Sequence, residues 1–352
     1  LGTAFTVFII SYAYSRIIEH FPSGGGGYIV ATHTISEKAG VVSGSALLVD
    51  YMLTITVSIA ACGEAIFSFL PFSYQPYKLP FACLLILILI VMNLRGVKES
   101  VLTLAPIFLV FIAAHALLLG YGILAQAPQI VPVADGIQAG LSRDLAAIGF
   151  IGVLAIFLRA YSLGGGTYTG IEAVANGMQI MREPRVKTGK RTMLYMAISL
   201  AVLSAGLFSC YLLWNVRPVA GQTLNAVLAT SVFATWPLGG ILALITIFSE
   251  AALLCVAAQT GFIDGPRVMA NMAIDSWLPR SFALLSERLT MTNGILLMGG
   301  SALLIMLFTR GSVLILVTMY AINVFLTFSI SEFGMSRFFY KNRATEKDWK
   351  RH

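Results

Sequence analysis

Long apolar stretches recur along the whole chain, and they restrict its fold more than any other feature. A helix needs about 20 mostly apolar residues to cross roughly 30 Å of hydrocarbon. We find nine such stretches, at residues 1–18, 42–70, 79–95, 101–124, 147–180, 193–214, 238–262, 292–309 and 312–333. Hydrophobic residues make up 58% of the chain and charged residues only 11%, unlike a water-soluble domain. The sequence therefore predicts an all-α membrane protein.

The basic residues alternate with the predicted spans. If the first span runs from outside to inside, eighteen Lys and Arg residues fall on the cytoplasmic side. Only four fall on the other side, namely Lys78, Arg143, Arg217 and Arg310. This bias fixes the orientation by the positive-inside rule and predicts a membrane core at 1–336 with a basic cytoplasmic tail at 337–352. The net charge of +7 thus follows the membrane, and nucleic acid is not an expected partner.

One predicted span is interrupted by glycine. Residues 147–180 are too long for one straight crossing, and they contain Gly164, Gly165 and Gly166 in succession. Each glycine costs a helix about 1 kcal/mol relative to alanine, so the helix is expected to unwind there. Transporters use such breaks near the membrane midplane to offer backbone groups to a substrate. Close helix packing through small residues is the alternative explanation.

The sequence indicates neither a nucleotide nor a resident metal. The glycine cluster at 21–28 lacks the Gly-Lys-Ser/Thr ending of a phosphate-binding loop, so we interpret it as a cytoplasmic re-entrant segment or gate. The four cysteines and four histidines are scattered without the spacing of a zinc or haem site. No cofactor is expected.

Four acids lie within predicted spans, and each needs a reason to be there. An acid at the centre of a span costs about 2.5–3.5 kcal/mol on the insertion scale. The four are Asp50, Glu64, Glu172 and Glu250. Burial favours the protonated form of a carboxyl group, so these acids are candidate proton carriers. Glu64 lies near the outer end of its span, which favours Glu172 and Glu250 as the proton-coupling candidates.

Two of these acids have neighbouring oxygen donors on the same helical face. Asp50 and Thr54 are spaced i, i+4 with Tyr51 beside them, and Thr169 and Glu172 are spaced i, i+3 after the glycine run. Carboxylate, hydroxyl and carbonyl oxygens together suit a hard monovalent cation. Two alternatives stay open. Asp50 could pair with Arg159 or a tyrosine, and Glu172 could hydrogen-bond to unwound backbone.

The motifs F-P-S-G-G-G-G-Y, after the first span, and G-T-Y-T-G-I-E-A-V-A-N-G-M-Q-I-M-R-E-P, in the fifth, resemble the amino acid/polyamine/organocation (APC) permeases. The resemblance covers essentially the whole chain. It implies a LeuT-like transporter core, a five-plus-five inverted repeat whose first and sixth helices are broken. The glycine-broken span would be family helix 6 and the last span helix 10. The chain would then hold helices 2 to 10, and the start at Leu1 without an initiator Met agrees with an N-terminally truncated sequence.

Within the superfamily, L-V-D-Y-M-L-T gives the likeness to bacterial potassium importers of the KimA type, because amino acid permeases usually have no acid there. Carried over, the cation-site residues are Asp50, Tyr51, Thr54, Thr169, Glu172 and Tyr320. The resemblance implies a plasma-membrane transporter that takes up K⁺ with H⁺. A homodimer is a further candidate assembly. A proton-coupled amino acid permease of the same fold is the alternative. A membrane-embedded enzyme is disfavoured, since no nucleophile, base and metal constellation is visible.

Overall fold

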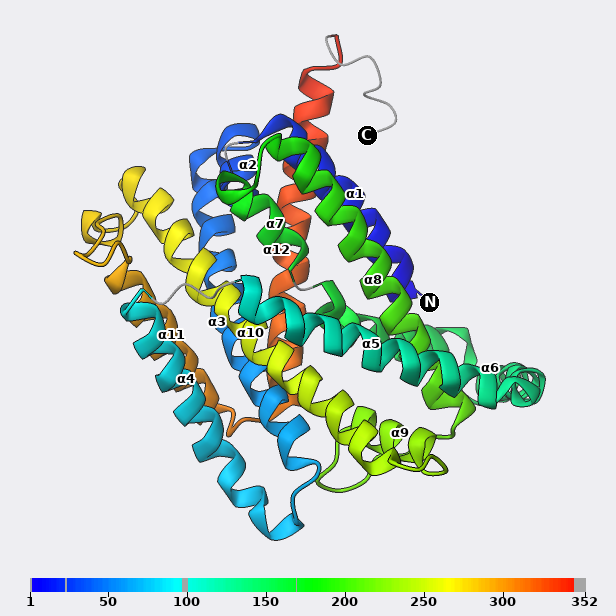
Figure 1. The fold of residues 1–352 in the computed structure, drawn as a ribbon. Coiled ribbons are helices and arrows are strands. Elements are labelled where there is room, and N and C mark those ends of the chain that lie inside the picture. Colours follow the sequence, from blue (N-terminus) through cyan, green and yellow to red (C-terminus); the bar gives the residue numbers. More distant parts are fainter. Residues whose placement is uncertain (1, 23, 97–100, 169, 345–352) are drawn as a thin grey trace.

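The computed structural model describes residues 2–22, 24–96, 101–168 and 170–344, and helices are the only regular secondary structure in these ranges (Figure 1). The α-helices are α1 (Gly2–His20), α2 (Gly26–Thr34), α3 (Glu37–Phe67), α4 (Lys78–Leu94), α5 (Val101–Ala125), α6 (Ile130–Leu163), α7 (Ile171–Asn176), α8 (Arg185–Leu213), α9 (Leu224–Phe233), α10 (Gly239–Ile274), α11 (Thr292–Phe308) and α12 (Val313–Lys341). Short 3-10 helices are η1 (Phe72–Tyr77), η2 (Ala127–Gln129), η3 (Gly164–Tyr168), η4 (Gly177–Ile180) and η5 (Arg280–Phe282).

Seven helical stretches of the described chain are long and apolar enough to cross a membrane. They include α3, α4, α5, the run through α6, α8, α10 and α12. The chain is therefore an all-helical, multi-pass membrane protein. The other two expected spans correspond to α1, of 19 residues, and α11, of 17 residues. The division into nine spans and a tail stays a prediction.

Several helices extend beyond the apolar stretches that predicted them. The expected loop between 125 and 146 is largely helical, because α6 starts at Ile130 and is only kinked at Gly149. Helix α9 occupies part of the expected loop between 214 and 238, and α10 runs twelve residues past the predicted end of its span to Ile274. Hydropathy identifies only the part of a helix that lies in the hydrocarbon. The helix itself continues into polar sequence as long as its backbone hydrogen bonds continue.

Helices α3 and α9 start at side-chain caps. The Ser36 hydroxyl accepts a hydrogen bond from the Ala39 backbone N–H, 3.2 Å away, at the start of α3. The Thr223 hydroxyl accepts one from the Ala226 N–H, also at 3.2 Å, at the start of α9. Each cap satisfies a backbone donor that has no partner within its own helix.

Helices α3 and α10 pack against each other more extensively than any other pair and form the centre of the molecule (Figure 1). Helices α4 and α11 lie together on one side of this pair, and α1 packs along α8 on the other. Helix α12 contacts α3, and the short α7 contacts α1, α2 and α8. This arrangement brings the middle of α3, the glycine-interrupted segment and α12 together around one cavity.

Candidate cation site

The helix is interrupted where the glycines occur. Helix α6 ends at Leu163, η3 covers Gly164–Tyr168, and α7 starts at Ile171 after Gly170, whose φ of 90° is left-handed. Gly165 allows this turn to approach α12, because a Cβ at this position would lie 3.3 Å from the Ala321 Cα. The break therefore sits against α12. Thr169, one of the predicted cation ligands, lies outside the described residues.

A buried cavity of about 130 Å³ lies between α3, the interrupted segment, α10 and α12. Its lining includes five of the six residues predicted as cation ligands, namely Asp50, Tyr51, Thr54, Glu172 and Tyr320. The two acids thus face one shared space, although they are far apart in the sequence. A water needs roughly 10–15 Å³ of such volume, so the cavity has room for an ion with part of its water shell.

The acids in this cavity have oxygens without hydrogen-bond partners. Asp50 is 7% exposed and Glu172 is 6% exposed. Among the described residues, Asp50 Oδ1 and both carboxyl oxygens of Glu172 have no hydrogen-bond partner. The Gly27 N–H and the Tyr14 hydroxyl lie beside Glu172 but complete no hydrogen bond of ordinary geometry. Buried unpaired oxygens are costly, so this arrangement fits a site whose partner is a mobile cation or proton.

The described lining is negative in character. It contains no Lys, Arg or His, while its polar members besides the acids are hydroxyl groups of Tyr and Thr. Arg159, considered as a partner for Asp50, has an exposed side chain on α6, whereas Asp50 is buried. The cavity therefore offers oxygen ligands to a cation and no fixed positive charge to an anion.

Tyr51 connects the two halves of the site. The Asn176 side-chain nitrogen at the end of α7 donates a hydrogen bond to the Tyr51 hydroxyl on α3. Both residues are buried. Since Tyr51 also lines the cavity, this bond fixes the position of the interrupted segment relative to Asp50.

The sequence did not identify four contributors to the site. Tyr168 and Thr260 also line the cavity, and Asn176 holds Tyr51. Gly27, in the glycine cluster after α1, packs its backbone beside Glu172. A Cβ there would lie 2.5 Å from Ser331 Oγ and 3.0 Å from Glu172 Oε1. Polar residues near a helix break could have suggested Tyr168 and Asn176, but nothing in the sequence pairs Gly27 with Glu172.

A third acid lies on α10, one turn beyond the cavity-lining Thr260. Asp264 is 5% exposed, and Arg267 Nη1 lies 3.3 Å from its Oδ1. It was missed because the predicted span ended at residue 262. The i, i+3 spacing of acid and base in D-G-P-R is the signal that could have found it.

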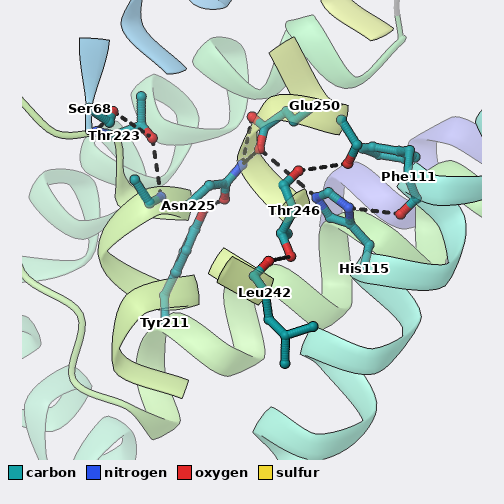
Figure 2. A network of polar contacts seen from close by, with 11 residues as sticks. Ser68, Phe111, His115, Tyr211, Thr223, Asn225, Leu242, Thr246 and Glu250 are labelled. Carbon is teal, nitrogen blue, oxygen red and sulfur yellow. Dashed lines mark hydrogen bonds and ion pairs between the residues drawn. The ribbon is translucent and has the colours of Figure 1, made fainter. Parts of the chain in front are cut away.

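Glu250, the other proton-coupling candidate, does not line this cavity. It lies in a separate polar network with Asn225 of α9 and His115 of α5 (Figure 2). The two candidates for proton coupling therefore occupy different places in the fold.

An all-helical membrane core with an interrupted helix and a buried, acid-lined cavity defines the class of polytopic membrane transporters. Comparison with known proteins agrees. Residues 1–351 match the family model described as "Amino acid permease". The chain is also 32% identical, over 355 aligned residues and 99% of its length, to the "Potassium transporter KimA" of Bacillus subtilis (strain 168).

The chain therefore belongs to the amino acid permease family of the APC superfamily, and it is a multi-pass protein of the plasma membrane. The superfamily resemblance seen in the sequence is confirmed. The chain spans 56% of the length of its Bacillus relative.

Proposed function

We propose that the protein takes up K⁺ together with H⁺ by alternating access around the cavity between α3, α7, α10 and α12. The observation that carries this proposal is that Asp50 and Glu172 face one buried cavity with unpartnered oxygens. The name of the Bacillus relative, a potassium transporter, supports the choice of ion. The LeuT-like five-plus-five inverted repeat and a homodimer belong to the same proposal.

The ion would lose part of its water shell and bind carboxylate and hydroxyl oxygens instead. Asp50, Tyr51 and Thr54 would supply these oxygens from α3, Glu172 from α7 and Tyr320 from α12. Two carboxylates in one small space repel each other, and a bound cation relieves that repulsion. The site is therefore expected to bind K⁺ more tightly when both acids are ionised than when one of them is protonated.

Alternating access requires parts of the molecule to move relative to each other. The 3-10 helix at Gly164–Tyr168 and the left-handed Gly170 separate α6 from α7, so the two segments are expected to tilt relative to each other at this point. Helices α3 and α10 pack most extensively and are expected to serve as the fixed frame. In this mechanism the hydrogen bond from Asn176 to Tyr51 holds α7 against α3 in the conformation described.

A proton-coupled amino acid permease is the second candidate, and the description of the matching family favours it. Unwound backbone at the break would then hold the carboxylate of the substrate. The charge of the cavity argues for the cation, because a substrate carboxylate would meet Asp50 and Glu172 with no basic residue among the described lining residues.

The test is growth at low K⁺ of a host that lacks its own potassium uptake systems, supplied with the complete protein. Rescue of growth, with ⁸⁶Rb⁺ or K⁺ uptake that increases as external pH falls, is the expected result. Uptake of radiolabelled amino acids is measured in the same cells. Failure to rescue, together with measurable amino acid uptake, would overturn the proposal in favour of the second candidate.

A further inference from the structure

A polar network outside the cation cavity surrounds Glu250 (Figure 2). Asn225 Nδ2 lies 2.9 Å from Oε1 and 2.9 Å from Oε2 of Glu250, so one amide group serves both carboxyl oxygens. The Tyr211 hydroxyl of α8 donates to Asn225 Oδ1. Because the oxygen of the amide accepts from Tyr211, its nitrogen is the part that faces Glu250.

His115 of α5 approaches Glu250 from another side, and its surroundings fix where its hydrogen lies. His115 Nδ1 is 3.0 Å from the Phe111 carbonyl oxygen. A carbonyl only accepts, so Nδ1 carries the hydrogen and Nε2 presents its lone pair in the neutral ring. Nε2 lies 3.9 Å from Glu250 Oε2 (Figure 2).

At 3.9 Å the two atoms are beyond hydrogen-bond distance, and the lone pair of a neutral His115 repels an ionised Glu250 carboxylate. A proton on His115 Nε2 or on Glu250 Oε2 removes this repulsion. The His115 side chain is 2% exposed and that of Glu250 is 20% exposed. Glu250 is therefore the more accessible member of the pair.

The other titratable neighbours do not supply a competing positive charge. Tyr211 and Cys210 come from α8, and neither carries a positive charge. Helix α9 contributes the uncharged Asn225. In the part of the chain that the structure describes, no Lys or Arg makes an ion pair with Glu250.

We propose that Glu250 and His115 together bind the coupling proton, and that Asn225 transmits its arrival to α9. This inference rests on the proposed function, because it names the proton site of that transport. Helix α9 connects α8 to α10 at the end of the molecule away from α2 (Figure 1), which the charge bias places outside. A proton from outside binds the pair, and when it resides on Oε2 the carboxylate of Glu250 becomes a carboxyl group. A protonated carboxyl group accepts a weaker hydrogen bond from Asn225 than a carboxylate does, so α9 is held less tightly to α10.

The test uses the complete protein reconstituted in vesicles that contain a pH-sensitive dye, with K⁺ and H⁺ fluxes measured together. In Glu250→Gln, H⁺ movement accompanying K⁺ is expected to fall about tenfold or more, because a neutral amide cannot take up the proton. K⁺ binding, measured by stabilisation against heat, is expected to stay unchanged. His115→Gln should shift the pH dependence of K⁺ uptake, and Glu250→Asp should retain coupling.

Glu64→Gln is the matched control, because Glu64 is another membrane acid, paired with Lys78 at 3.2 Å and outside both the cavity and this network. It should couple K⁺ and H⁺ as the wild type does. If the wild-type protein moves K⁺ without H⁺, the proton coupling of the proposed function is wrong. If the wild type couples and Glu250→Gln couples equally well, only the inference about Glu250 is wrong.

Should Glu250→Gln fail to fold, His115→Gln decides. A pH profile in that variant identical to the wild type would overturn the inference. A shifted profile with unchanged K⁺ binding would support it.

Discussion

The Tyr51 hydroxyl on α3 accepts a hydrogen bond from the Asn176 side chain at the end of α7, and this bond ties the cation cavity to the segment after the helix break. The relationship explains why an aromatic hydroxyl, and not only a carboxylate, stands beside Asp50. It also shows that the neighbouring residues Asp50 and Tyr51 have different roles in the site. Asp50 supplies charge to the cavity, whereas Tyr51 supplies both an oxygen and a fixed distance between two elements.

Removal of this bond has a predictable effect. Tyr51→Phe should lower the free energy of unfolding by about 1–3 kcal/mol, because Asn176 then keeps a buried donor without a partner. The KM for K⁺ should rise while the maximal rate falls less. Thermal unfolding in detergent and ⁸⁶Rb⁺ uptake measure the two effects. Tyr74→Phe, at an exposed position of η1, is the control and should change neither. An unaltered KM in Tyr51→Phe would contradict the assigned role.

Asp50 can be tested for charge alone. Asp50→Asn keeps the shape of the side chain and removes its negative charge. We expect K⁺ affinity to fall about 10- to 100-fold, because a charge-assisted interaction contributes about 1.5–3 kcal/mol. Protein stability should not fall, since burial of a neutral amide costs less than burial of a carboxylate.

Isothermal titration of purified protein with K⁺ measures this affinity. Asp144→Asn serves as the control because Asp144 is an exposed acid on α6. If Asp50→Asn binds K⁺ as tightly as wild type, the cavity is not the cation site, and the amino acid alternative gains support.

The glycine cluster after α1 predicts a steric effect on Glu172. In Gly27→Ala the new methyl group would lie 2.5 Å from Ser331 Oγ and 3.0 Å from Glu172 Oε1. Forced repacking of this kind costs typically about 1–3 kcal/mol, and the displaced Glu172 should reduce uptake. The double variant Gly27→Ala/Ser331→Ala removes the nearer contact and should recover stability but not full uptake.

Gly136→Ala is the control for this series. Gly136 lies in α6, where an added Cβ meets nothing within 4 Å, so alanine should be neutral or stabilise the helix by up to about 1 kcal/mol. Thermal unfolding of all four proteins compares them. Equal melting temperatures for Gly27→Ala and wild type would show that Ser331 and Glu172 can move away from the added methyl group without cost.

Some parts of this fold follow from the sequence, and others depend on which faces meet in space. The apolar stretches, the acids within them and the glycine run at Gly164–Gly166 are local features, and the helices and the interruption lie where these features occur. Helix α9 and the extension of α10 are polar or short, so hydropathy alone does not reveal them. The contact between Gly27 and Glu172, and the separation of Glu250 from the cavity, depend on the packing of distant helices. The spacing of residues within one helix does not specify which distant helix packs against it.

The pair of Asp264 and Arg267 allows a test by a double-mutant cycle. Arg267→Gln leaves the buried carboxylate of Asp264 without its partner, and we expect a loss of about 1–3 kcal/mol in the free energy of unfolding. Asp264→Asn alone should cost less, because Arg267 is 33% exposed in its side chain and can be solvated. The double variant Asp264→Asn/Arg267→Gln should be close to wild type, so that it loses less than the sum of the two single losses. Additive losses in the single and double variants would mean that the two side chains do not interact in solution.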